Sequence, residues 1–89
     1  MIISEHAVDQ YLARVEDISR DEARRKILQI INSGVEVLPK WKKKKRYEHF
    51  YVAFDILVIV EKNTVVTIDS LDEISQALYG KKEFELIDG

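Results

Sequence analysis

Residues 47–69 read YEHFYVAFDILVIVEKNTVVTID, and their pattern of apolar and polar residues is the clearest indication of the fold. Apolar and polar residues alternate over 47–54, as they do in a strand with one buried face. Residues 56–60 are apolar without interruption, which is typical of a central strand covered on both sides. The pair Lys62-Asn63 indicates a turn, because Asn tolerates left-handed backbone angles, and residues 65–69 follow as the next strand. We therefore expect an antiparallel meander.

Two amphipathic helices precede this meander. Ser4 is a favourable N-cap for a helix over residues 5–17. Ser19 opens a second helix with a Ser-x-x-Glu capping box, and Gly34 ends it. A short strand over residues 35–38 then leads into the meander.

The end of the chain carries a third helix signal and a tail. Another capping box begins at Ser70 and predicts a short C-terminal helix that closes at Gly80. The tail 81–89 could add an edge strand, dock on the sheet or contact a partner. We expect one domain, residues 1–89, of α+β class: two N-terminal helices packed on a four-stranded antiparallel sheet, with a short C-terminal helix.

Alternation also predicts which side chains share a face of the sheet. We expect one face to lie toward the helices and the other to lie away from them. The expected helix-facing residues are Phe50, Val52, Phe54, Val66 and Ile68, and the expected outward residues are Tyr47, His49, Tyr51, Val65 and Thr67.

Composition excludes several classes of function. The chain has 89 residues and no cysteine, so disulfides and thiolate chemistry are absent. Its Asp, Glu and His show no metal-ligand spacing, and its three glycines form no phosphate loop, so we expect neither metal nor cofactor. The opening residues lack the pattern of a signal peptide, and the longest apolar run, 56–60, is too short to span a bilayer. We expect a cytoplasmic protein without a membrane partner.

Positive charge is concentrated in one region. The net charge is −2, but residues 20–46 contain ten Lys and Arg against three Asp and Glu, a local charge of +7. Clustered cations beside aromatic rings suit a phosphate backbone with unstacked bases. The alternative is a solvated loop, or an edge strand protected from aggregation. The candidate nucleic-acid-binding residues are Trp41, Lys42, Lys43, Lys44, Lys45, Arg46, Tyr47 and Tyr51.

Two histidines are the candidates for acid–base chemistry. His6 lies in the first turn of a helix, where amide donors can hold a phosphate, and Arg14 falls on the same polar side. His49 lies between Tyr47 and Tyr51 on a strand, where it could serve as acid or base. We take His6, Arg14 and His49 as candidate catalytic residues. The alternative is that each histidine is an ordinary surface residue.

Three segments resemble small RelE-like and BrnT-like bacterial proteins, many of which are toxins of toxin–antitoxin pairs. The N-terminal segments are Ser4-Glu5-His6-Ala7 and the stretch from Arg14 to Ala23, and residues 63–68 are similar to the last core strand of these proteins. The resemblance covers about residues 4–69 and implies a metal-independent ribonuclease fold with two helices on a four-stranded antiparallel sheet. It also implies RNA cleavage as the activity and an antitoxin-like protein as a partner. Gln10 departs from the arginine that many members carry four residues after the histidine.

These observations support three functions. The first is a RelE/BrnT-like protein that acts on RNA, with metal-independent endoribonuclease activity. The second is a non-catalytic protein- or nucleic-acid-binding module on the same fold. The third is a DNA-binding accessory protein of a mobile element.

Overall fold

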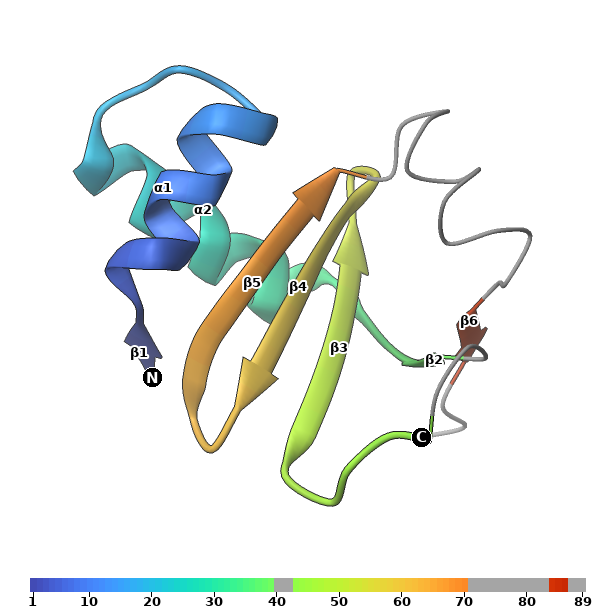
Figure 1. The fold of residues 1–89 in the computed structure, drawn as a ribbon. Helices are drawn as coiled ribbons and strands as arrows, with labels where there is room; N and C mark the ends of the chain where they lie inside the picture. The colour runs from blue at the N-terminus through green and yellow to red at the C-terminus, as the bar shows by residue number, and fades with distance from the viewer. Residues whose placement is uncertain (40–42, 71–83, 87–89) are drawn as a thin grey trace.

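Two helices and six strands make up the part of the chain that the structure, a computed structural model, describes: residues 1–39 and 43–70, with the backbone of 84–86. The helices lie together beside one face of the sheet (Figure 1), so the α+β class is confirmed. The predicted C-terminal helix falls outside the described residues. In chain order the elements are β1 (Ile2–Ile3), α1 (Glu5–Arg14), α2 (Arg20–Ser33), β2 (Val35–Pro39), β3 (Glu48–Ala53), β4 (Ile56–Glu61), β5 (Thr64–Ser70) and β6 (Phe84–Leu86).

Both helices begin at the serines that the sequence predicts. Ser4 Oγ accepts a hydrogen bond from the Ala7 N–H at 3.0 Å, and Ser19 Oγ accepts one from the Glu22 N–H at 3.2 Å. α2 also ends where expected, with Gly34 at its C-cap.

α1 is shorter than the predicted helix 5–17, because its last turn widens into an i→i−5 hydrogen bond. The N–H groups of Val15 and Glu16 both donate to the Tyr11 carbonyl, at 2.9 and 3.3 Å. The helix therefore ends at Arg14.

The sheet has six strands in the order β1-β5-β4-β3-β2-β6. Its four central strands pair antiparallel, as predicted. The prediction of a four-stranded sheet is wrong, because β1 adds parallel to β5 and β6 adds antiparallel to β2. The added strands have only two and three residues, too few to show a period of two in the sequence. β6 gives the tail one of the three roles left open, that of an edge strand.

The structure reverses the predicted faces of β3. Tyr51 and Ala53 pack against the main core cluster, which contains the buried residues of both helices. Phe50 and Val52 belong to a second cluster on the opposite face, with Leu57 of β4. Alternation separates the two faces of a strand but does not say which one the helices cover, and both faces of β3 carry apolar residues. Both assignments were therefore compatible with the sequence.

A β-bulge lies in β5, and the prediction that Val65 points away from the helices is wrong because of it. The pairing jumps from Ile59–Thr67 to Val60–Val65, so Val66 is an extra residue. Val65 and Ile68 are three positions apart, so in a regular strand they would lie on opposite faces. Because of the bulge, both belong to the main core cluster.

The N-terminal segment covers the outer edge of β5. The Ile2 N–H donates to the Asn63 carbonyl at 3.0 Å, and the Ser4 N–H donates to the Val65 carbonyl at 3.1 Å. Farther along the strand, side chains of α1 replace the missing strand partner. The Ile68 N–H donates to Gln10 Oε1 at 2.8 Å, and Arg14 Nη1 donates to the Ile68 carbonyl at 3.0 Å. Backbone N–H and carbonyl groups at this edge of β5, which could otherwise pair with a strand of another chain, thus have partners within the molecule.

Gly34 joins α2 to β2 at a place where no side chain fits. A Cβ atom there would lie 2.3 Å from the Ile30 carbonyl oxygen and 3.0 Å from the Val52 carbonyl oxygen. Both neighbours are backbone atoms, which cannot move aside as a flexible side chain could. The end of α2 is therefore held directly against β3.

Gly34→Ala should lower the free energy of unfolding by roughly 1–3 kcal/mol, because the added methyl forces the α2–β3 contact apart. Urea denaturation followed by circular dichroism measures this change. Asn32→Ala, at an exposed position in the last turn of α2, should stay within about 0.5 kcal/mol of the parent chain. A Gly34→Ala chain as stable as the parent would contradict the close approach.

Candidate nucleic-acid interface

A tight turn over residues 45–48 leads into β3. The Lys45 N–H donates to Glu48 Oε1 at 2.9 Å, and the Glu48 N–H donates back to the Lys45 carbonyl at 3.0 Å. Glu48 is only 3% exposed, so this carboxylate anchors the turn from the inside. Lys43, Lys45 and Arg46 are exposed around it.

Tyr47 is flanked by two ammonium groups. The Nζ atoms of Lys45 and Lys62 lie 5.8 and 5.1 Å from the centroid of its ring, within the range of cation–π contacts. Contact with Tyr47, and secondarily the Glu48 carboxylate, raises the pKa of Lys45 above its usual value. Lys62 is not among the binding residues predicted from the sequence. The hairpin register could have found it, since the Lys62 N–H donates to the Tyr47 carbonyl at 3.3 Å and extends the β3–β4 pairing.

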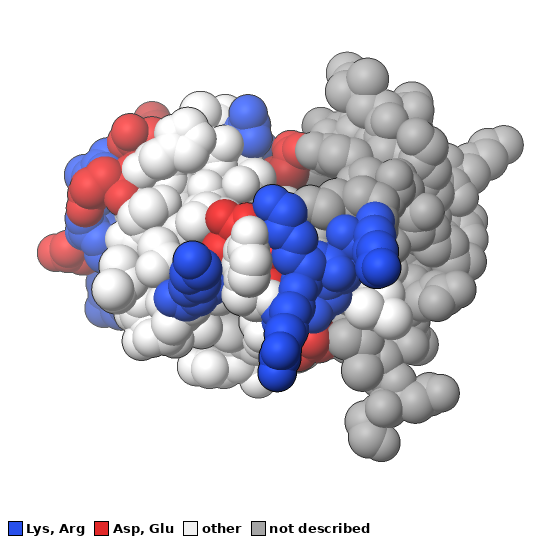
Figure 2. Space-filling model, turned by 60° about the horizontal axis from the view of Figure 1, so that its bottom comes forward, with Lys and Arg blue, Asp and Glu red and all other residues white. Residues whose placement is uncertain are grey.

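We call this region the Lys–Tyr surface. Figure 2 shows Lys and Arg side chains gathered on one face of the molecule, with acidic side chains among them. Two predicted binding residues, Trp41 and Lys42, lie outside the described residues. The described members of the surface are Lys43, Lys44, Lys45, Arg46, Tyr47 and Lys62.

A histidine–carboxylate pair lies farther along β3. His49 Nδ1 is 3.2 Å from Glu36 Oε2 on the neighbouring strand β2. A carboxylate only accepts hydrogen bonds, so this contact requires a hydrogen on Nδ1. With the imidazole neutral, Nε2 is then the basic nitrogen. The His49 side chain is 42% exposed, so solvent and ligands can reach it.

Tyr51 completes the cluster. Its ring stacks on His49 with 6.4 Å between the ring centroids. Burial, and secondarily the charge and hydrogen bond of Glu36, raise the pKa of the Tyr51 hydroxyl above its usual value. Tyr51 therefore stays protonated at neutral pH. We call Glu36, His49 and Tyr51 the His49 cluster.

The Lys–Tyr surface and the His49 cluster both include aromatic residues on the same side of β3. Alternation places Tyr47, His49 and Tyr51 on the same side, as the sequence predicts, but this is the side of the helices. Tyr47 is 40% exposed, whereas Tyr51 packs against the core. His49 thus lies where the open part of the strand meets the covered part.

The structure does not bring His6 and Arg14 into this arrangement. His6 is exposed in the first turn of α1, and no hydrogen bond or ion pair among the described residues joins it to His49. Arg14 binds the Ile68 carbonyl at the outer edge of β5, and β4 separates β5 from β3. Of the three predicted catalytic residues, only His49 borders the Lys–Tyr surface.

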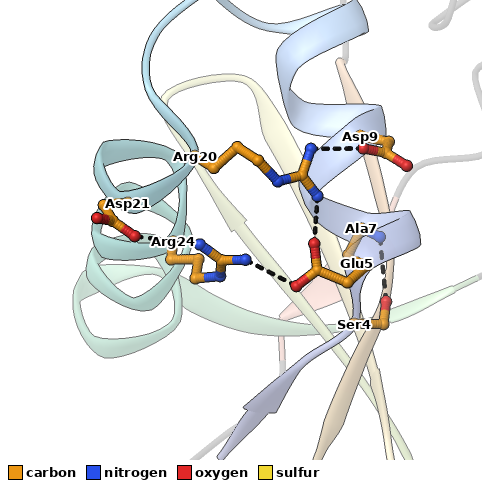
Figure 3. A network of polar contacts seen from close by, with 7 residues as sticks. All are labelled: Ser4, Glu5, Ala7, Asp9, Arg20, Asp21 and Arg24. Carbon is orange, nitrogen blue, oxygen red and sulfur yellow. Dashed lines mark hydrogen bonds and ion pairs between the residues drawn. The ribbon is translucent and has the colours of Figure 1, made fainter.

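Arginines of α2 are engaged in a network of ion pairs with acidic residues (Figure 3). Arg20 contacts Glu5 and, at 2.7 Å, Asp9. Arg24 contacts Glu5 at 2.7 Å and Asp21 at 3.2 Å. The network joins the N-terminal parts of α1 and α2. It therefore uses part of the positive charge of residues 20–46 for structure.

The described residues, 1–39 and 43–70, also bear on metal binding and on membrane insertion. No group of three or more His, Asp or Glu among them has an arrangement that could hold a metal ion. Neither of their helices is long and apolar enough to cross a membrane.

The chain matches no protein-family model, and comparison with curated proteins and with solved structures also found no match. The resemblance to RelE-like and BrnT-like proteins therefore stays a prediction from the sequence.

The ion pairs predict how stability depends on pH. Arg20, and then Arg24, hold the pKa of Glu5 below its usual value of 4.5. Lys26, and then the Tyr11 hydroxyl, lower the pKa of Glu16 in the same way. A carboxylate whose pKa is lower in the folded state stabilises fully above its unfolded pKa and loses this effect as the pH falls toward its folded pKa. Stability should therefore fall as the pH drops below 4.5.

Urea midpoints measured from neutral pH to well below 4.5 test this expectation. Glu5→Gln should lose less stability over this range than the parent chain, because one of the linked groups is gone. Glu22→Gln removes an exposed carboxylate outside the network and should follow the parent chain. If the urea midpoints of Glu5→Gln and of the parent chain fell equally with pH, the Glu5 ion pairs would not contribute to the pH dependence of stability.

Proposed function

We propose that the chain binds single-stranded RNA through the Lys–Tyr surface and cleaves it without a metal, with His49 as the acid–base group. The observation that carries the proposal is the position of His49. It is oriented by Glu36 at 3.2 Å and follows Tyr47, which lies between two ammonium groups, on the same side of β3. The resemblance to RelE-like and BrnT-like proteins supports the same activity and adds an antitoxin-like protein as an expected partner.

The Lys–Tyr surface suits an RNA strand for two reasons. Its cations can neutralise backbone phosphates, and Tyr47 offers a ring on which a base can stack. Lys45 and Lys62 are both exposed, so either side chain can leave the ring for a phosphate when a base takes its place. The buried Glu48 carboxylate keeps the backbone of this turn in place while the side chains move.

The His49 cluster supplies the groups for transesterification. His49 Nε2 takes the proton of a ribose 2′-hydroxyl, whose oxygen then attacks the adjacent phosphorus. The bond from phosphorus to the 5′-oxygen breaks, and that oxygen takes a proton from solvent. The products are a 2′,3′-cyclic phosphate and a 5′-hydroxyl. Glu36 holds the imidazole in the required tautomer and stabilises the imidazolium, while lysines of the surface offset the negative charge on the phosphoryl oxygens.

Binding without cleavage is the second candidate. Arg14, one of the predicted catalytic residues, donates to a backbone carbonyl of β5. The site then lacks an arginine from α1 for the transferring phosphate. This reading keeps the Lys–Tyr surface and makes the His49 cluster a structural contact between β2 and β3.

Lys43→Gln should weaken binding to single-stranded RNA and reduce the salt dependence of the affinity. Removing one phosphate contact lowers the slope of log K against log salt by about 0.7. Fluorescence anisotropy of a labelled RNA over a salt series measures the slope. Arg25→Gln removes the same charge from an exposed position on α2 and should leave the slope unchanged. Equal effects of the two changes would contradict a localised binding surface.

His49→Ala should reduce RNA cleavage in the presence of EDTA by at least about 100-fold, because the acid–base group is lost. Gel analysis of a labelled RNA measures the rate and reports the cyclic phosphate end. His6→Ala is the matched control and should retain the parent rate. A His49→Ala chain with the parent rate would contradict the assignment, and a parent chain that binds RNA without cutting it would favour the second candidate.

A further inference from the structure

The turn between β3 and β4 places a bulky apolar residue in an unfavourable conformation. Phe54 and Asp55 have φ angles of 53° and 59°, in the left-handed region. Hairpin turns of this kind favour Asn and Gly, and a large side chain there is an outlier. Phe54 is also 73% exposed, so burial in the core does not explain its presence. Such an outlier is a reason to look for function.

A pocket lies directly beside this turn. Its volume is about 280 Å³, and Phe54 forms part of its wall. Apolar side chains of Val15, Ile30 and Ile56 line it, so it can take an aromatic ring.

Charged groups of both signs border the same patch. Lys26 Nζ contacts Glu16 Oε1 at 2.6 Å on the pocket wall, and the Lys26 side chain is 46% exposed. The Glu16 carboxylate also accepts a hydrogen bond from the Tyr11 hydroxyl, which fixes it in place. Asp55 is exposed beside Phe54 and makes no ion pair with another described residue. Lys26 retains N–H groups that can meet a further carboxylate.

We propose that this patch is a homodimer interface, in which Phe54 enters the pocket of a second copy of the chain. A two-fold interface is self-complementary, because each contact occurs twice with the roles of the copies exchanged. The patch has the parts that this symmetry requires: a projecting ring, a pocket, an exposed carboxylate and an accessible ammonium group. Asp55 would then face Lys26 of the partner subunit, and the two Phe54 rings would meet at the axis.

Dimerisation through this patch leaves the Lys–Tyr surface free. The Phe54–Asp55 turn follows Ala53 at one end of β3, and the basic turn precedes Glu48 at the other end (Figure 1). The inference is therefore independent of the proposed function. A dimer would carry two Lys–Tyr surfaces.

Sedimentation equilibrium over a concentration series tests the proposal, with Phe54→Asn as the decisive variant. Asn is favoured in left-handed turns, so Phe54→Asn should unfold at a higher urea concentration when measured as a monomer. It should nevertheless weaken dimerisation by at least about 30-fold, because the anchoring ring is lost. Stability and association thus change in opposite directions, which a purely structural role of Phe54 cannot produce.

Val35→Ala is the control, because Val35 is 51% exposed and does not line the pocket. It should dimerise like the parent chain. A parent chain that stays monomeric at all concentrations would overturn the proposal, even if another protein binds the pocket. So would a Phe54→Asn chain that dimerises as well as the parent, or a Val35→Ala chain that loses dimerisation equally.

Discussion

The contact between Gly34 and the backbone of β3 determines how the two layers of the molecule meet. α2 passes into β2 through this single residue, and the position of its Cα leaves no room for a side chain beside Ile30 and Val52. The end of the helix is therefore fixed over the side of β3 that carries Ala53, whose Cβ lies 3.4 Å from the Cβ position of residue 34. Tyr51, two residues earlier on the same side, consequently packs against the core that the helices form.

The contact at Gly34 also makes the two ends of β3 differ in how far the helices cover them. At the start of the strand, Tyr47 and His49 lie on the helix side but remain 40% and 42% exposed. This is the region where we propose RNA binding and cleavage. At the other end, the turn after Ala53 carries the exposed Phe54 next to a pocket between both helices and β4. The proposed RNA-binding surface thus lies at the end of β3 that the helices leave exposed, and the proposed dimer patch lies at the end where both helices meet β4.

The positive charge of the chain divides into two parts with different roles. Arg20 and Arg24 hold α2 to α1 through Glu5, and Arg14 holds α1 to the edge of β5. The lysines around Tyr47 are exposed and remain available to an anionic partner. A count of charges along residues 20–46 could not separate these roles, because acidic partners such as Glu5 and Asp9 lie outside that stretch in the sequence.

Local signals in the sequence predicted much of this fold. Caps at Ser4 and Ser19 and the turn at Lys62-Asn63 depend on neighbouring residues, and the structure confirms them. The face of β3 that meets the helices depends on the Gly34 contact between distant segments, and alternation alone could not reveal it. The Glu36–His49 pair likewise depends on the register of β2 against β3, which no local pattern specifies.

Nuclear Overhauser contacts from the aromatic rings of β3 show which side of this strand the helices cover. We expect contacts from the Tyr51 ring to methyl groups of α1 and α2, together with contacts from the Phe50 ring to Val37 and Leu57 on the other face. Contacts from the Phe50 ring to helix methyl groups, with none from Tyr51, would show that the helices cover the opposite side of the sheet and that Gly34 does not hold α2 against β3 as described.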